Sequence, residues 1–115
     1  MALRSELQQH IDHLPNLRRR WLSNRIRCVD EGWRVSMSSS GGSRVDSYCY
    51  EENGRVLTLA GEGGGGGADV IVPHELCWDD APAVPIDDAT TRQILFNLTA
   101  AIQYFGWSAT FHYED

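Results

Sequence analysis

The residues best suited to chemistry form two short-spaced pairs. His10 and His13, and His74 and Cys77, are three positions apart, which places each pair on one face of a helical turn. Either pair supplies two ligands, whereas a structural zinc site needs four. A Cys77 nucleophile beside His74 would also need an orienting group and an oxyanion hole, and we can assign neither. We therefore expect no catalytic residue, no bound metal and no cofactor.

A glycine-rich run, Gly61–Gly66, matches the letters GxGxxG of a dinucleotide-binding loop. That loop holds a pyrophosphate because a helix N-terminus follows it directly. Here a short Val-Ile-Val run follows instead, and the chain contains no Gly-Lys-Ser or Gly-Lys-Thr. The pattern favours a mobile connecting loop, one able to adapt to a partner, over a nucleotide site.

Five acidic side chains fall within one short stretch, and a tryptophan lies among them. The stretch contains Glu75, Trp78, Asp79, Asp80, Asp87 and Asp88. Adjacent acids are typical of helix caps and solvated loops, and they do acid–base chemistry only when burial raises one pKa. Trp78 is either a core anchor or an exposed contact residue. We predict that these residues form an acidic partner-binding surface, and that reversing Asp79 and Asp80 slows association while leaving the fold intact.

Charge is distributed unevenly along the 115 residues, which carry a net charge of −6. Residues 1–30 contain six Arg against three acids, and residues 31–115 contain four Arg against 13 acids. An acidic body disfavours direct binding to nucleic acid and favours a basic protein partner. The three cysteines are widely spaced, and no apolar run has the roughly 18 residues that a membrane span needs. We expect a cytoplasmic protein with reduced thiols and no membrane contact.

The first 30 residues show helical spacing. Leu7, Ile11 and Leu14 recur on one side of a helix over residues 5–14, which Pro15 interrupts. A second short helix is expected from Asn16, with the run 18–20 of three Arg on its solvent face. These features predict an N-terminal helical arm over residues 1–30, attached to an α+β domain over residues 31–115, in a single domain overall.

The pattern changes to alternation at Trp33, which predicts a half-buried strand over 33–37. Strand-like runs over 44–51 and 55–60, and a short apolar run over 69–73 closed by Pro73, predict three more strands. Asn53-Gly54 between two of these runs is the signal of a type I′ hairpin. Short connections favour an antiparallel meander. Residues 74–86 are expected to form one helical turn and then an extended loop.

The strongest helical pattern lies near the C-terminus. An apolar stripe runs from Ile94 to Phe105, Asp87 or Asp88 can cap the helix, and Gly106 can end it. Alternation over 107–113 then predicts a final strand. The expected fold is an antiparallel meander sheet with one long C-terminal helix packed on it and a final strand after the helix. Leu98 and Phe111 are expected to be buried where helix and strand meet.

A set of short motifs resembles small immunity proteins of bacterial polymorphic toxin systems, in particular the family called immunity protein 74. The motifs are the run 54–62, the apolar strand 70–73, Trp78 followed by Pro82, the helix containing Ile94, and the final strand. The resemblance covers about residues 44–113 and does not include residues 1–30. It implies a cytoplasmic antitoxin without enzyme activity, which binds one cognate toxin domain and occludes its active site. It implies no particular binding residues.

A second class of function is compatible with the same elements. A small enzyme or ligand-binding domain would use a pocket between helix 88–105 and the sheet, with His74, Cys77 or His112 inside it. A secretion chaperone or structural adaptor is a third alternative.

The isolated ligand pairs lead to a prediction about metal content. The purified protein is expected to hold no stoichiometric zinc, and a chelator should leave its melting temperature unchanged, because neither pair has partners at ligand spacing. Elemental analysis that found one zinc per chain would overturn this expectation.

Overall fold

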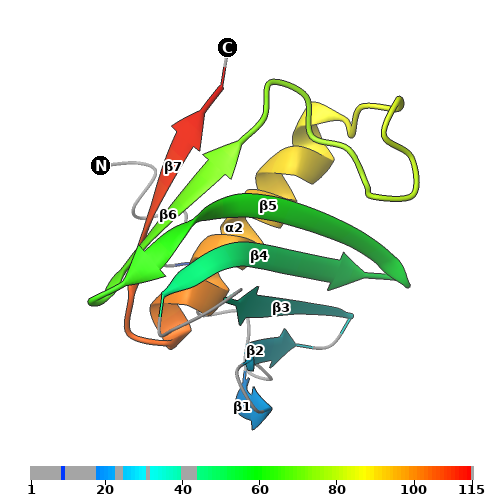
Figure 1. The fold of residues 1–115 in the computed structure, drawn as a ribbon. Helices are drawn as coiled ribbons and strands as arrows, with labels where there is room; N and C mark the ends of the chain where they lie inside the picture. Colours follow the sequence, from blue (N-terminus) through cyan, green and yellow to red (C-terminus); the bar gives the residue numbers. More distant parts are fainter. Residues whose placement is uncertain (1–8, 10–17, 23–24, 31, 40–43, 115) are drawn as a thin grey trace.

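A computed structural model describes residues 9, 18–22, 25–30, 32–39 and 44–114. Over these residues the chain forms an α+β fold of seven strands and one long helix (Figure 1). The strands are β1 (Arg18–Leu22), β2 (Arg25–Asp30), β3 (Trp33–Ser38), β4 (Val45–Glu52), β5 (Arg55–Gly64), β6 (Gly67–Val72) and β7 (Ser108–Tyr113). The helix is α2 (Asp88–Tyr104), between β6 and β7.

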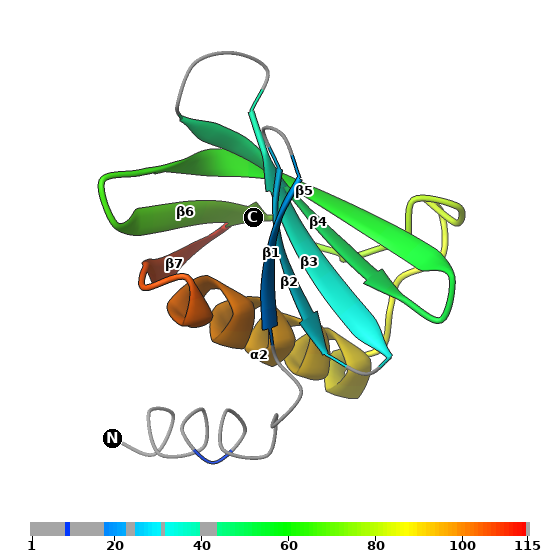
Figure 2. The same cartoon turned by 90° about the horizontal axis from the view of Figure 1, so that it is seen from below.

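The strands form one sheet in chain order, from β1 at one edge to β7 at the other. Each pair from β1 to β6 is antiparallel, and the meander predicted from Trp33 onward is confirmed for β3–β6. β7 is parallel to β6 because the chain crosses one face of the sheet through α2 before it returns. Figure 2 shows α2 lying along that face, beside β7.

The alternating pattern of the sequence correctly predicts which residues of β3 are buried. Trp33, Val35 and Met37 of β3 are buried, as are Tyr48 and Tyr50 on the same face of β4. The predicted hairpin is also formed: Asn53 and Gly54 have φ angles of 54° and 77°, as a type I′ turn requires. The buried faces of these strands therefore all point toward α2.

The helix has the predicted ends and the predicted buried stripe. Ile94, Leu98 and Ile102 are fully buried against the sheet. At its end, Gly106 has φ 86°, and the Trp107 N–H donates to the Ile102 carbonyl over 3.2 Å, which is a Schellman motif. Phe111 of β7 is half-buried, so it packs against the core less completely than Leu98.

The predicted helical arm is wrong over residues 18–30. Arg18–Leu22 and Arg25–Asp30 are strands β1 and β2, which pair with each other and continue the sheet from β3. Cys28 lies opposite Val35 and is fully buried, so the arm and the body share one core. The weak helical propensity of this segment is overridden by main-chain pairing with β3. Apart from Gln9, which is helical, the predicted helix 5–14 lies outside the described residues.

The glycine run is not a mobile loop. Its first residues complete β5 and pair with β6, and the turn is Gly65-Gly66, with φ angles of 61° and 88°. A methyl group at Gly61 would overlap the carbonyl oxygen of Asp69 and lie 2.9 Å from Cε2 of Tyr48. Glycine is therefore required here because the backbone of β6 at Asp69, and then the Tyr48 ring, leave no room for a side chain.

A further correction concerns residues 73–87, which contain bends and turns but no helical turn. This segment, the 73–87 loop, connects β6 to α2. Pro82, Pro85 and the capping residue Asp87 lie in its second half. Because the prolines disfavour helix and Asp87 caps it, α2 begins only at Asp88.

Close packing at Gly61 leads to a prediction about stability. Gly61→Ala should lower the free energy of unfolding by about 1–3 kcal/mol, the usual cost of forcing extra atoms into a packed site. Gly64→Ala is the matched control, since a methyl group there would meet no atom within 4 Å. Urea denaturation measures both. Equal stability of the two variants would contradict the packing argument.

Candidate functional site

A buried polar connection sets the position of α2 on the sheet. Asn97, which is 2% exposed, donates from Nδ2 to the hydroxyl of Tyr50 over 2.8 Å. The Tyr50 hydroxyl in turn donates to Glu52 Oε1 over 2.7 Å, and Gln93 Nε2 donates to Asn97 Oδ1 over 3.2 Å. Burial, followed by the hydrogen bond to Glu52, raises the pKa of Tyr50, so its hydroxyl stays protonated at neutral pH.

On the flank of α2 that faces β7, the helix and the strand leave an open groove of about 440 Å³, the α2–β7 groove. Leu95 and Phe96 are the apolar part of its helix wall, which also carries polar side chains, and the Arg92 guanidinium lies 5.0 Å from the centre of the Phe96 ring. Ala109, Phe111 and Tyr113 form its strand wall. Tyr113 is 67% exposed. The groove therefore combines an apolar, aromatic strand wall with a helix wall of both apolar and polar side chains.

A second hollow, of about 400 Å³, lies beneath the 73–87 loop. It shares Asp88, Thr91 and Tyr113 with the α2–β7 groove, so the two form one continuous concave surface. Glu75 lines the second hollow. Two of the predicted partner-binding acids, Glu75 and Asp88, are thus brought to the rim of one surface. Neither forms an ion pair with any described residue.

The other predicted site residues have structural contacts. Asp87 caps α2: the Thr90 N–H donates to Oδ1 over 2.7 Å and the Thr90 hydroxyl to Oδ2 over 3.0 Å. These hydrogen bonds hold the pKa of Asp87 below its ordinary value of 3.8. As a cap, Asp87 adjoins the concave surface but its carboxylate is already engaged.

Asp79 attaches the 73–87 loop to the sheet. Its N–H donates to the Val56 carbonyl over 2.8 Å, and its carboxylate accepts from the N–H and hydroxyl of Thr58, over 3.1 and 2.7 Å. β6 pairs only with the last residues of β5, so Asp79 satisfies main-chain groups in the first half of that strand. Reversal of Asp79 would break these contacts. The prediction that reversing Asp79 and Asp80 leaves the fold intact is therefore withdrawn.

Trp78 and Asp80 contact the same part of β5. The Arg55 guanidinium lies 5.1 Å from the centre of the Trp78 ring, and its Nη2 is 2.9 Å from Asp80 Oδ1. Trp78 is half-buried, with its ring 6.3 Å from that of Tyr50. The structure therefore packs Trp78 as an anchor, while the Asp80 side chain stays 65% exposed.

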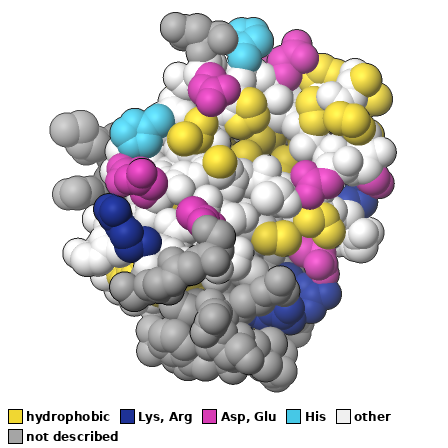
Figure 3. Space-filling model, in the orientation of Figure 1, with side chains coloured by type: hydrophobic (Ala, Val, Ile, Leu, Met, Phe, Trp, Pro, Cys, Tyr) yellow, Lys and Arg dark blue, Asp and Glu magenta, His cyan; other side chains and the backbone are white. Residues whose placement is uncertain are grey.

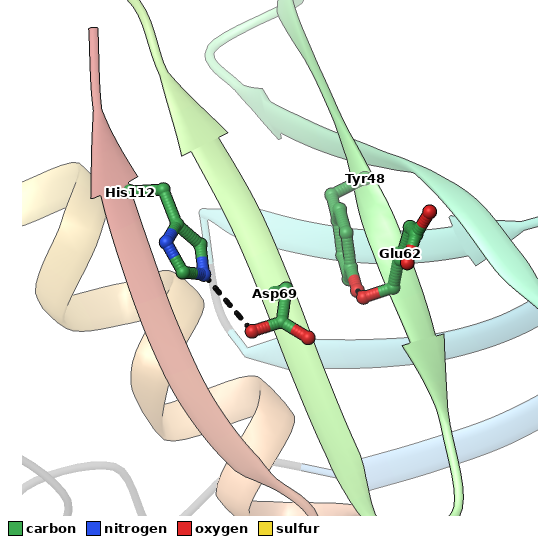
Figure 4. Close-up of polar contacts among 4 residues, drawn as sticks. All are labelled: Tyr48, Glu62, Asp69 and His112. Carbon is green, nitrogen blue, oxygen red and sulfur yellow. Dashed lines mark hydrogen bonds and ion pairs between the residues drawn. The ribbon is translucent and has the colours of Figure 1, made fainter.

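Titratable residues also meet on the opposite, open face of the sheet (Figure 4). Glu62 and Asp69 are cross-strand partners, and His112 Nε2 lies 3.0 Å from Asp69 Oδ1. Beneath them, the Tyr48 hydroxyl donates to the Glu62 carbonyl over 2.8 Å. Burial, and then the Asp69 charge, raise the pKa of Tyr48 to about 12. His112 thus gives the Asp69 carboxylate a hydrogen-bond partner beside Glu62.

The histidines and cysteines do not assemble into a site within the described part of the chain. His74 lines the second hollow, but Cys77 and His112 line neither hollow. Among the described residues, no three His, Cys, Asp or Glu side chains come close enough to hold a metal ion. The pair His10 and His13 lies outside the described residues.

Acidic side chains are spread over the face of the molecule seen in Figure 3, interrupted by few basic ones. The described helices include none with the length and apolar character that a membrane crossing requires. In comparisons with known proteins, no family model matches the chain, and no curated protein or solved structure shows significant similarity to it.

The sequence predicts a pocket between helix 88–105 and the sheet for the alternative function, with His74, Cys77 or His112 inside it, but none of these three lines the α2–β7 groove and its wall residues were not predicted. Alternation over 107–113 correctly places Ala109, Phe111 and Tyr113 on one face, but it predicts that this face is covered. The signal available in the sequence is Phe96, an aromatic residue that lies off the buried stripe of α2. Large apolar residues beyond the width of a core-facing stripe indicate a second contact surface.

The Asp87 cap leads to a prediction about acid stability. Because the folded-state pKa of Asp87 is lowered, its stabilising contribution is complete above 3.8 and is lost as the pH falls through the lowered value. Asp87→Asn keeps a capping oxygen but does not titrate, so its stability should fall less steeply below pH 3.8 than that of the unsubstituted protein. Urea unfolding midpoints across this range test the effect. Asp88→Asn is the control, because it removes a charge from the first turn of α2 and leaves the Asp87 cap in place. If the two variants gave superimposable curves of stability against pH, the effect could not be assigned to the Asp87 cap.

Proposed function

We propose that this protein is an antitoxin of the immunity-protein class, which binds a cognate bacterial toxin domain and occludes its active site. The observation that carries the proposal is the continuous concave surface of the α2–β7 groove and the adjoining hollow, with Glu75 and Asp88 at its rim. An apolar floor with a charged rim is the composition of a protein interface. The motif resemblance over about residues 44–113 supports the same class.

Inhibition by occlusion requires a packed interface and no catalytic group on the inhibitor, so we propose no enzyme activity and no cofactor. Toxin domains that act on nucleic acids have basic clefts, since phosphate binding needs positive charge. A chain with a net charge of −6 attracts such a cleft and steers its approach. The proposed partner is therefore a basic protein domain in the cytoplasm, with no direct role for nucleic acid or membrane.

The proposed interface is centred on Glu75 and Asp88. Asp87 borders it, while Trp78 and Asp79 support the loop that shapes it. Asp80 is exposed on the β5 side of that loop, where it pairs with Arg55. The proposed centre is thus the two ends of the acidic stretch, Glu75 and Asp88, and no longer includes Asp79 and Asp80, whose reversal is the test that the sequence suggests.

The test is the double reversal Glu75→Arg with Asp88→Arg, measured against the protein encoded by the neighbouring gene, purified as an inactive variant. Association should be at least about tenfold slower at low salt and its salt dependence should be flatter, because rim charges act mainly on encounter. Protection of cells that express the active toxin should fall in parallel.

Glu62→Arg is the control, because it reverses an exposed acid on the open face of the sheet. Both variants should keep the melting temperature of the unsubstituted protein within a few degrees. Unchanged association and full protection by the double reversal would place the interface elsewhere. No binding by the unsubstituted protein would refute the antitoxin function itself.

Ligand binding in the same groove is the second candidate. Its volume of about 440 Å³ is within the range of small-molecule pockets, roughly 300–1,000 Å³. This function predicts that a small apolar ligand raises the melting temperature of the protein alone, and a screen without such a hit would count against it.

A further inference from the structure

The outer edge of β7 carries main-chain groups that no described strand uses. β7 is the last strand of the sheet, and β6 is its only neighbour among the described residues. In a parallel ladder, the N–H and the C=O of one residue point to the same side of the strand. The residues of β7 therefore divide into those that face β6 and those that face outward.

Two hydrogen bonds establish which residues face outward. The Ser108 N–H donates to the Gly66 carbonyl over 3.0 Å, and the Glu114 N–H donates to the Val72 carbonyl over 2.9 Å. The even-numbered residues of β7 therefore pair with β6. Ala109, Phe111 and Tyr113 direct both main-chain groups away from the sheet, where they can pair with a further strand.

The same three residues form the strand wall of the α2–β7 groove. A strand added along β7 would lie over this groove, and its alternate side chains would enter the space beside Leu95 and Phe96. Main-chain pairing and side-chain pockets together are the elements of recognition by strand addition.

β7 also lacks the features that protect an edge strand from pairing. Its sequence, Ser-Ala-Thr-Phe-His-Tyr, contains no Pro and no Lys, and it is rich in residues that favour strands. The outer edge of β7 is therefore open to pairing with a further strand.

We infer that the outer edge of β7 binds an extended, basic segment of the toxin domain as an eighth strand, with apolar side chains of that segment in the α2–β7 groove. The inference rests on the proposed function and adds the mode of binding. Asp88 and Arg92 line the groove and Glu75 lines the adjoining hollow, so acids outnumber Arg by two to one on this surface, and with the net charge of −6 this favours a strand with positive charge. A second copy of this chain, with a net charge of −6 and the same acidic rim, is disfavoured as the occupant.

Two variants of the full chain test the inference against the inactive toxin protein. Ala109→Pro removes one outward N–H and leaves the ladder to β6 intact, as proline does at an open edge. Tyr113→Ala removes an exposed wall of the groove. Each should raise the dissociation constant at least about tenfold, the effect of losing a central contact. Tyr104→Ala is the matched control, since Tyr104 is 48% exposed on α2 and does not line the groove, and its affinity should stay within about twofold.

Amide hydrogen exchange gives an independent readout that does not depend on a variant folding. In the free protein, the Ala109 and Phe111 amides should exchange quickly and those of Thr110 and His112 slowly. Adding the inactive toxin protein should slow exchange at Ala109 and Phe111 at least about tenfold, as new strand pairing does.

The outcomes separate the two proposals. Binding by the unsubstituted protein with unchanged affinity of both variants overturns strand addition and leaves the antitoxin function standing. Slow exchange at Ala109 and Phe111 in the free chain also overturns it, because the edge would already be covered by another part of the chain or by a second copy. No binding by the unsubstituted protein overturns both.

Discussion

The hydrogen bond from Asn97 to Tyr50 is the interaction on which the arrangement of helix and sheet depends. Apolar contacts hold α2 against the sheet, but they are not directional and would tolerate a small shift or rotation of the helix. A buried amide has no such freedom, because an unpaired polar group in the core costs about 1–3 kcal/mol. Asn97 therefore keeps α2 in one register over β4, and Tyr50, held between the rings of Trp33 and Trp78, keeps that register aligned with the 73–87 loop.

The candidate site follows from this placement. With Asn97 turned toward Tyr50, Leu95 and Phe96 lie on the flank of α2 that faces β7, and the groove opens between them and the strand. The same register brings Asp88 to the end of the groove, close to the hollow that contains Glu75. The proposed interface thus depends on the core, although none of its acidic residues is buried.

Several features of this arrangement could be predicted from the sequence. Alternation at Trp33, Val35 and Met37, the Asn53-Gly54 turn and the ends of α2 depend on residues close together in the chain, and local geometry decides them. The strands formed by residues 18–30 could not be predicted, because pairing with β3 outweighs a weak local preference for helix. The glycine run could not be interpreted correctly either, because Gly61 is required by the close approach of the Asp69 carbonyl on β6 and of the Tyr48 ring on β4, and both follow from strand pairing.

The sequence by itself determined the fold class, the core-facing sides of β3 and α2 and an excess of acidic residues after residue 30. It also identified the acidic stretch, since composition and periodicity are properties of neighbouring residues. Only the tertiary structure decided which acids share a surface. Asp79 and Asp87 are engaged by Thr58 and Thr90, whereas Glu75 and Asp88 meet at one concave surface. The parallel pairing of β7, which turns Ala109, Phe111 and Tyr113 outward, was likewise settled by the crossover through α2, a long-range constraint that local spacing does not encode.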